Sequence, residues 1–261
     1  MVSHRSFIII GNWKMHKTCE EALSFVKNFI SSFQPKASLL TGLAVPYTLI
    51  YPLSQAVAES SLLIGAQNMN DASEGAFTGE IAASMIKDAG AQFVLLGHSE
   101  RRRLYGEDDA FINRKLKKAI ETGIRPILCI GETKEQYERK ETHSVIESQL
   151  AEGLKEIEPG RLKDFILAYE PIWAIGNGHS ASPENVQEVH QFCRKILKQM
   201  LSDEIGENIV IQYGGSVNSS NAQSFLEQPD VDGLLIGGAS LSLDSFLQIV
   251  NNDYSKIQSA G

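Results

Sequence analysis

Three side chains that could move or stabilise protons follow short apolar runs in this sequence. Glu170 comes directly after the run from Phe165 to Tyr169 and before Pro171, while His98 and Lys14 follow two other apolar runs. A carboxylate can act as a general base, an imidazole can donate a hydrogen bond to a carbonyl oxygen, and an ammonium can neutralise an anion or an enolate. Together these residue types predict proton transfer beside a carbonyl group.

Each of these residues also has a simpler interpretation. Glu170 alone is most often a solvated acid, His98 a core or capping histidine, and Lys14 an exposed amine. Pro171 favours a strand that ends at Glu170, and the apolar segment from Ile172 to Ile175 would make the carboxylate a stronger base by desolvation. The helix that we expect after His98 favours a neutral imidazole. The sequence leaves open whether Lys14 neutralises charge or forms a Schiff base.

Two glycine-rich segments follow the last two apolar runs: Gly214-Gly215-Ser216 and Gly237-Gly238. Singly they are ordinary turn glycines, but barrels build phosphate sites from backbone N–H groups at these positions. Gly176-Asn177-Gly178 lacks the spaced third glycine of a dinucleotide fingerprint. Without a Walker lysine motif or a metal-spaced His/Cys/Asp cluster, the sequence predicts chemistry on a phosphorylated small molecule with no cofactor and no metal.

Short apolar runs recur along the whole chain and must position these residues. They begin near Phe7, Leu39, Leu62, Phe93, Pro126, Phe165, Ile209 and Gly233, about 32 residues apart on average, which is the size of a βα unit. Nearly continuous apolar runs are typical of parallel strands covered on both faces. The pattern predicts an α/β fold, a (β/α)8 barrel with eight parallel strands, in a single domain over residues 1–261. A doubly wound open sheet is the alternative. The expected helices are Thr18 to Ser32, Gly79 to Lys87, Asp108 to Glu121, Thr133 to Ile157, Pro183 to Leu201, Ser219 to Leu226 and Ser242 to Val250.

The composition argues against several classes of partner and environment. The formal net charge is −8, so the chain has no broad basic face for nucleic acid or an anionic membrane. Cys19, Cys129 and Cys193 are odd in number and far apart, which favours reduced thiols over a disulfide framework. No apolar run approaches the ~20 residues of a membrane span. We therefore expect a soluble, cytoplasmic protein.

The strand-end motifs resemble the triosephosphate isomerase family in order and spacing, over essentially the whole chain. The matching segments are Gly11-Asn12-Trp13-Lys14-Met15, Gly75 to Glu80, Leu96 to Arg102, Tyr169 to Gly176, and Gly237-Gly238-Ala239-Ser240. The resemblance implies a TIM barrel that interconverts dihydroxyacetone phosphate and D-glyceraldehyde 3-phosphate through an enediolate. It also implies a place in glycolysis, gluconeogenesis and pentose phosphate metabolism, and no cofactor.

The same resemblance implies a role for each residue. Glu170 would shuttle the proton between adjacent carbons, and His98 would be a neutral electrophile at the oxygens. Lys14 would be the nearby cation, oriented by Asn12, with Glu100 as a supporting carboxylate. This division of labour is the general one described for the enzyme. Substrate and phosphate would be bound by Asn12, Lys14, Gly176, Ser216, Gly237 and Gly238.

A covering loop and a second subunit also follow from the resemblance alone. The loop would close as a lid between Pro171 and Ala181, with Pro171-Ile172-Trp173 and His179-Ser180-Ala181 as its two hinges. Its residues would be Pro171, Ile172, Trp173, Ala174, Ile175, Gly176, Asn177 and Gly178. The long connection from Gln67 to Gly79 would insert into a partner in a homodimer, with Thr78 near the partner's site. Asn177 stands where the family usually has threonine, and His16 where it usually has asparagine, so lid kinetics and dimer strength are open.

Two rival functions remain at this stage. One is a Schiff-base aldolase of phosphorylated sugars with Lys14 as nucleophile. The other is a non-catalytic barrel that binds phosphate metabolites or acts as a surface adhesin. The presence together of Glu170, His98 and Lys14 argues against a binder, because binding alone needs no base.

Overall fold

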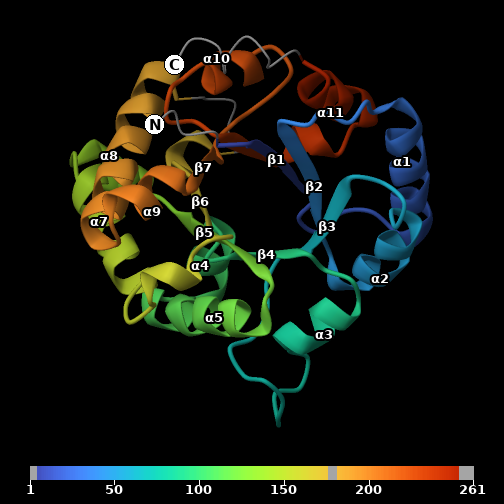
Figure 1. Cartoon of the computed structure of the whole chain (residues 1–261), viewed down its shortest axis with the longest axis horizontal. Helices are drawn as coiled ribbons and strands as arrows, with labels where there is room; N and C mark the ends of the chain where they lie inside the picture. Colours follow the sequence, from blue (N-terminus) through green and yellow to red (C-terminus); the bar gives the residue numbers. More distant parts are fainter. Residues whose placement is uncertain (1–4, 176–180, 253–261) are drawn as a thin grey trace.

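Eight parallel strands close into a barrel in the computed structural model, which describes residues 5–175 and 181–252 (Figure 1). The barrel is closed because β1 pairs with both of its neighbours: Ile8 lies opposite Leu40 of β2 and opposite Gly233 of β8. This confirms the predicted TIM barrel, and the open-sheet alternative is wrong. The strands are β1 (Phe7–Asn12), β2 (Leu39–Val45), β3 (Leu62–Ala66), β4 (Phe93–Leu96), β5 (Arg125–Ile130), β6 (Ile166–Tyr169), β7 (Val210–Tyr213) and β8 (Gly233–Ile236).

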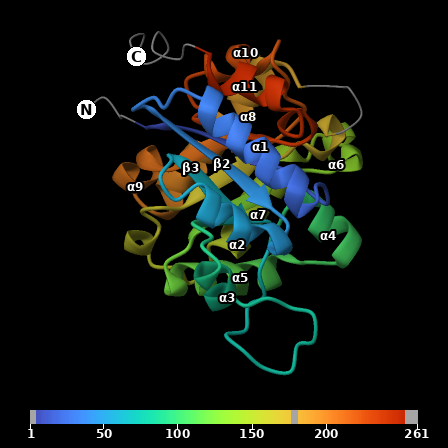
Figure 2. The ribbon, with the colours of Figure 1, turned by 90° about the vertical axis from the view of Figure 1, so that its right-hand side faces the viewer.

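Helices surround the barrel and cover the outer face of its strands (Figures 1 and 2). Those described are α1 (Cys19–Ser32), α2 (Tyr47–Ala56), α3 (Ala83–Asp88), α4 (Ser99–Tyr105), α5 (Asp109–Thr122), α6 (Lys134–Glu138), α7 (Thr142–Gly153), α8 (Pro183–Met200), α9 (Asp203–Asn208), α10 (Ala222–Leu226) and α11 (Leu243–Val250), with 3-10 turns η1 (Pro159–Arg161), η2 (Ile172–Ala174) and η3 (Gly238–Ser240). Across residues 5–175 and 181–252, no helix is both long enough and apolar enough to cross a membrane.

Capping residues set several helix starts. Thr18 forms a capping box with Glu21 at the start of α1, and Thr133 does the same with Gln136 at α6. The single helix expected from Thr133 to Ile157 is wrong, however, because α6 and α7 are separate. The break contains Lys140, whose φ of 58° is left-handed and cannot continue a helix.

The strands are buried on both faces, as their apolar runs predicted. Ile8 and Ile10 pack with Phe93 and Leu95 in one cluster, whereas Ile9, the residue between the two isoleucines, belongs to the larger cluster shared with the helices. Each such side chain contributes about 1.5–3 kcal/mol by leaving water. This packing holds the strand ends rigidly. Barrels carry their functional groups at the carboxyl ends of the strands.

The connection between β3 and α3 projects away from the barrel (Figure 2). Its base is fixed by Asn70, whose backbone N–H donates to Ile81 O at 2.9 Å and whose side-chain amide donates to Glu80 Oε2 at 2.7 Å. Phe77 and Thr78 are exposed on the projecting part. An ordered base and an apolar tip are features of a loop with a function.

Candidate active site

The predicted site residues meet in one cavity of about 300 Å³ at the carboxyl ends of the strands. This is the end of a parallel barrel at which loops assemble reactive groups. Leu235, Gly214 and Gly215 form further parts of the wall. The predicted residues that line the cavity are Asn12, Lys14, His98, Glu170, Ser216, Gly237 and Gly238.

Glu170 is buried and tightly held. Its side chain is 2% exposed, its Oε1 lies 3.0 Å from His98 Nε2, and its Oε2 accepts the Ser99 backbone N–H at 2.9 Å. The Glu170 backbone N–H donates to Ile130 O at 2.7 Å, which extends the β6 pairing by one residue. Gly131 is required beside it, because a Cβ there would lie 1.9 Å from Glu170 O. The carboxylate is thus fixed at the strand end, inside the cavity.

His98 forms the start of α4 and uses both ring nitrogens. Nδ1 accepts the Glu100 backbone N–H at 3.2 Å, so Nδ1 carries no proton and Nε2 is the N–H that faces Glu170. Burial lowers the pKa of His98, but the charge and the hydrogen bond of Glu170, together with the charge of Glu100, raise it overall. The Glu100 N–H at the helix start favours the neutral imidazole with its donor at Nε2, whereas the raised pKa favours the protonated ring. The neutral imidazole expected from the sequence remains a prediction.

Lys14 and Glu100 form an ion pair with 2.7 Å between Nζ and Oε1. Burial would raise the pKa of Glu100, but the hydrogen bond from Lys14 and the nearby His98 ring lower it overall. The Lys14 backbone is left-handed, with φ of 50°, and is held by its N–H to Asn12 Oδ1 at 3.0 Å and by Gln67 Nε2 to its carbonyl at 2.8 Å. Asn12 thus orients the lysine. Glu100 does not line the cavity itself, but it contacts Lys14, which does.

The glycine-rich side of the cavity has one backbone donor already in use. The Ser216 N–H donates to Ala174 O of η2 at 2.9 Å. Gly238 begins η3, and a Cβ on Gly237 would lie 3.6 Å from Lys14 Cε. Any anion that takes the Ser216 N–H must first displace the Ala174 carbonyl.

A buried carboxylate, that of Glu132, is hydrogen-bonded to a side chain of η2. Glu132 Oε1 accepts the Trp173 indole N–H at 2.7 Å and the Tyr169 hydroxyl at 3.1 Å. Burial raises the pKa of Glu132, although the hydrogen bond from Trp173 opposes that shift. Of the expected lid, Pro171 to Ile175 are described, and Ala181 is buried. Gly176, Asn177, Gly178, His179 and Ser180 lie outside the described residues.

Sequence reasoning missed some supporting residues. Ser99 directly follows His98 at a helix start, where free backbone N–H groups are expected, so its bond to Glu170 had a signal. Glu132 follows the end of β5, and the strand-end rule applied to Glu170 would also have selected it. Gln67 offered no such signal, because its contact with Lys14 depends on how β1 and β3 are brought together.

Two predictions concern features outside the cavity. Thr78 lies on the projecting loop and not among the residues that line the site. Within the part of the chain that the structure describes, no group of three or more His, Cys, Asp or Glu residues is placed to hold a metal ion.

Comparison with known proteins agrees with the geometry. A family model described as "Triosephosphate isomerase" matches residues 7–253. The chain is 60% identical over 250 residues to a triosephosphate isomerase of Protochlamydia amoebophila, covering 96% of this chain and 94% of the relative. It is 48% identical to one of Chlamydia trachomatis serovar D, with 93% and 88% covered, and 44% identical to one of Carboxydothermus hydrogenoformans, with 94% and 98% covered.

Proposed function

This chain belongs to the triosephosphate isomerase family, and on that premise we propose that Glu170 is the base by which it interconverts dihydroxyacetone phosphate and D-glyceraldehyde 3-phosphate. The chain is an isomerase. The observation that carries the residue assignment is a buried carboxylate 3.0 Å from the Nε2 atom of a buried imidazole in one small cavity.

The reaction is a pair of proton transfers through an enediolate. Glu170 removes a proton from the carbon next to the carbonyl while His98 Nε2–H donates a hydrogen bond to the carbonyl oxygen. The electron pair of the broken C–H bond forms the C=C bond of the enediolate while the carbonyl π pair moves onto oxygen, which takes a proton from His98 Nε2. His98 then recovers a proton from the neighbouring hydroxyl oxygen as Glu170 returns its proton to the adjacent carbon. To do so, Glu170 must turn from His98 and Ser99 towards the substrate. Lys14 stabilises the charge that develops on oxygen.

Phosphate binding falls to the glycine-rich side of the cavity. The donors are the backbone N–H groups of Ser216 and Gly238, with Gly237 giving close access to Lys14. Binding exchanges the Ser216 to Ala174 hydrogen bond for one to phosphate. The resemblance adds Gly176 to the phosphate-binding residues. It also implies a lid that includes Gly178 and Asn177, the residue that stands where the family usually has threonine. Such a cover would exclude water from the enediolate.

The aldolase alternative is less consistent with the geometry. A Schiff-base nucleophile must be a neutral amine, but the 2.7 Å pair with Glu100 favours the charged ammonium of Lys14. A non-catalytic binder is disfavoured because it has no use for a buried base beside a hydrogen-bond donor.

A homodimer is the proposed assembly, and its argument is exposed apolar surface. Met15 is 94% exposed and Phe77 is 52% exposed, both on segments next to the site or on the projecting loop. Contiguous exposed apolar surface marks interaction sites, and a second copy of the chain is the partner that the resemblance implies. Thr78 would then approach the partner's site, and the exposed His16 departure would bear on dimer strength. A cytoplasmic location and a single domain over residues 1–261 remain predictions.

A coupled assay tests the proposal. Purified protein is incubated with glyceraldehyde 3-phosphate and the appearance of dihydroxyacetone phosphate is followed, with Glu170→Gln as the matched variant of nearly equal size. We expect rapid conversion by the wild type and a large loss in the folded variant. Equal rates in the two proteins would exclude Glu170 as the base.

A further inference from the structure

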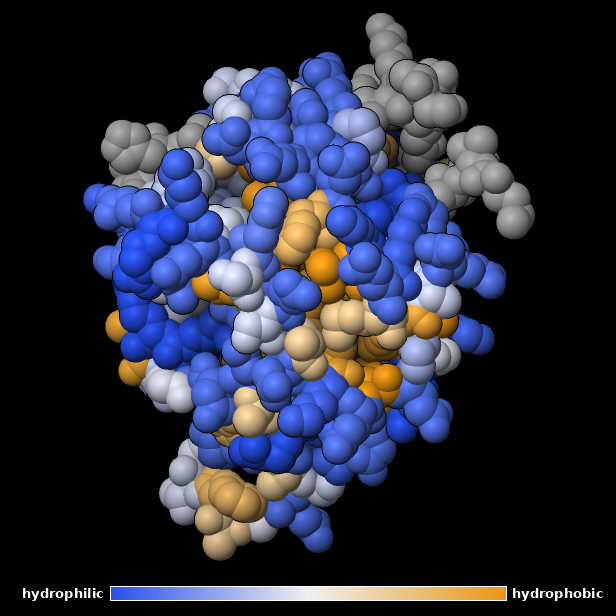
Figure 3. All heavy atoms as spheres, turned by 90° about the vertical axis from the view of Figure 1, so that its left-hand side faces the viewer, coloured by the Kyte–Doolittle hydropathy of each residue, from blue (hydrophilic) through white to orange (hydrophobic). Residues whose placement is uncertain are grey.

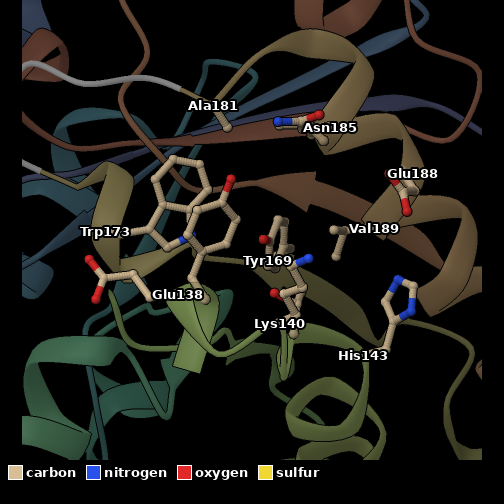
Figure 4. Close-up of a pocket in the computed structure, with 12 residues that line it drawn as sticks. Glu138, Lys140, His143, Tyr169, Trp173, Ala181, Asn185, Glu188 and Val189 are labelled. Atoms are coloured by element: carbon tan, nitrogen blue, oxygen red, sulfur yellow. The ribbon is translucent and has the colours of Figure 1, made fainter. Parts of the chain in front are cut away.

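A second cavity, of about 480 Å³, lies outside the strand-end site (Figure 4). It is bounded by the turn between α6 and α7 on one side and by the first turns of α8 on the other. Trp173 and Tyr169 form its inner wall, and none of Glu170, His98 and Lys14 reaches it. The face built by α7 and α8 is largely hydrophilic, with apolar atoms visible near its centre (Figure 3). The volume is within the range of small-molecule sites.

The inner wall of this cavity is aromatic, and aliphatic side chains lie opposite it. Trp173 stacks on Tyr137 with 4.2 Å between ring centroids and 25° between planes, so the indole is held on its outer side as well as by Glu132. Ala181 and Val189 stand across from it on the α8 side. Rigid aromatic walls opposite aliphatic side chains suit an aromatic or branched apolar group.

The cation at the rim is Lys140, and its backbone is unusual. Its φ of 58° is left-handed, a conformation that disfavours every residue with a Cβ and favours glycine. The Lys140 N–H donates to Tyr137 O at 2.9 Å, which closes the turn. Among the described residues no carboxylate lies within ion-pair distance of its ammonium. A lysine in place of the less strained glycine points to a use for its side chain.

Two carboxylates, Glu138 and Glu188, also line the cavity, and they differ in how they would affect a bound anion. Glu138 has Lys134 Nζ at 3.8 Å from its carboxylate, and it points away from the cavity in Figure 4. Glu188 lies on the α8 side, opposite Lys140, and the Asn185 amide lies on the same helix. An anionic group would therefore be attracted to the Lys140 side of the rim and repelled from the Glu188 side, which orients a ligand.

We propose that this cavity binds a small carboxylate with an aromatic or branched apolar body. The apolar body packs between Trp173 and Val189, and the carboxylate lies at the Lys140 ammonium. This is a second ligand site, separate from the one that binds the triose phosphate.

Occupation of this cavity opposes substrate binding, a consequence that rests on the proposed phosphate site. Trp173 and Ala174 are neighbours in η2, and the Ala174 carbonyl accepts the Ser216 N–H at 2.9 Å. A ligand packed on Trp173 stabilises η2 where it now lies, and so stabilises the bond that phosphate must displace. The two ligands weaken each other, by the same factor in both directions.

The test uses the two tryptophans of the chain as reporters. Trp13 is fully buried and donates to Ser240 O, whereas Trp173 lines the cavity. The indole N–H resonances of ¹⁵N-labelled protein are followed while 3-phenylpropionate is added, with 3-phenylpropylamine as the cationic probe of matched size. We expect 3-phenylpropionate to shift the Trp173 resonance saturably and to leave that of Trp13 in place. The amine should bind at least tenfold more weakly.

Variants locate the site. Lys140→Gln should weaken 3-phenylpropionate about tenfold, as loss of one charge-assisted contact implies. Lys27→Gln removes an exposed cation on α1, outside the cavity, and should change nothing. Val189→Phe should fill the cavity and abolish the shift. No saturable shift at millimolar probe, equal binding of the amine, or an undiminished shift in both Lys140→Gln and Val189→Phe would overturn the proposal.

Coupling has its own measurement. Saturating 3-phenylpropionate should raise the KM for glyceraldehyde 3-phosphate, and inorganic phosphate should raise the Kd of the probe by the factor with which the probe weakens phosphate. An unchanged KM with the probe bound would refute the coupling through Ala174 and Ser216. The binding readout needs no turnover, so it does not depend on whether Glu170 is the base.

Discussion

Shortening the proposed base by one methylene should lower the rate by a factor that follows from the distances in the site. In Glu170→Asp the carboxylate withdraws by about 1.5 Å, the length of one C–C bond. The contacts now at 3.0 Å to His98 Nε2 and 2.9 Å to Ser99 N would open beyond hydrogen-bond reach, and the distance to a substrate carbon would grow similarly. A misplacement of about 1 Å costs on the order of 10²-fold in rate, or about 2.7 kcal/mol of activation free energy.

The assay is steady-state turnover in both directions, with thermal unfolding as the control for the fold. We expect kcat to fall about 10²-fold, KM to change little because the phosphate contacts remain, and the melting temperature to move by only a few degrees. Glu170→Gln should be slower than Glu170→Asp, since it keeps the position but loses the base. A kcat for Glu170→Asp within threefold of the wild type would refute the role of Glu170.

Three further outcomes follow from buried groups. Burial raises the pKa of the Cys193 thiol to about 12 and that of Cys129 well above its usual range, so a thiol reagent should label only Cys19 in the native protein and all three cysteines after denaturation. Burial lowers the pKa of His190 to about 4. Below pH ~6.5 the unfolded chain therefore binds a proton that the folded protein does not, and the free energy of unfolding should fall by about 3 kcal/mol between pH 6.5 and 4. Urea titrations should not find this loss in His190→Gln. Asp232 accepts from Arg5 Nε at 2.6 Å and Arg194 Nη2 at 2.7 Å, so Asp232→Asn should cost about 3–5 kcal/mol in urea unfolding, and a loss under 1 kcal/mol would contradict a structural role for this buried pair.

The strands could be predicted from the sequence because their apolar runs are short, continuous and regularly spaced. The observed β6 and β7 each begin within one residue of the expected start. Closure of the barrel could not be derived from the runs alone, because an open sheet has the same repeat. The pairing of β1 with β8 settles it.

Helices were predicted less well where local signals conflict. α2 contains Pro52, which argues against a helix in a pattern-based analysis. The gap between α6 and α7 depends on Lys140 in a left-handed conformation, with neither glycine nor proline to mark it. In both places tertiary packing overrides the propensity of the residues.

The composition of the site was predictable, and its hydrogen bonds were not. Residue types at strand ends identify Glu170, His98 and Lys14, because parallel strands bring those ends together. The protonated nitrogen of His98 follows from the Glu100 N–H, and the state of the Ser216 N–H follows from Ala174. Both depend on backbone geometry, which side-chain types do not encode.

Proton exchange with solvent tests the central claim most directly. Dihydroxyacetone phosphate is converted in D₂O and the glyceraldehyde 3-phosphate formed is trapped and examined by ¹H NMR. If Glu170 carries the proton through an enediolate, deuterium appears at C2 of the product, and Glu170→Gln loses both the product and the label. Rapid conversion by Glu170→Gln, with or without deuterium at C2, would contradict the account.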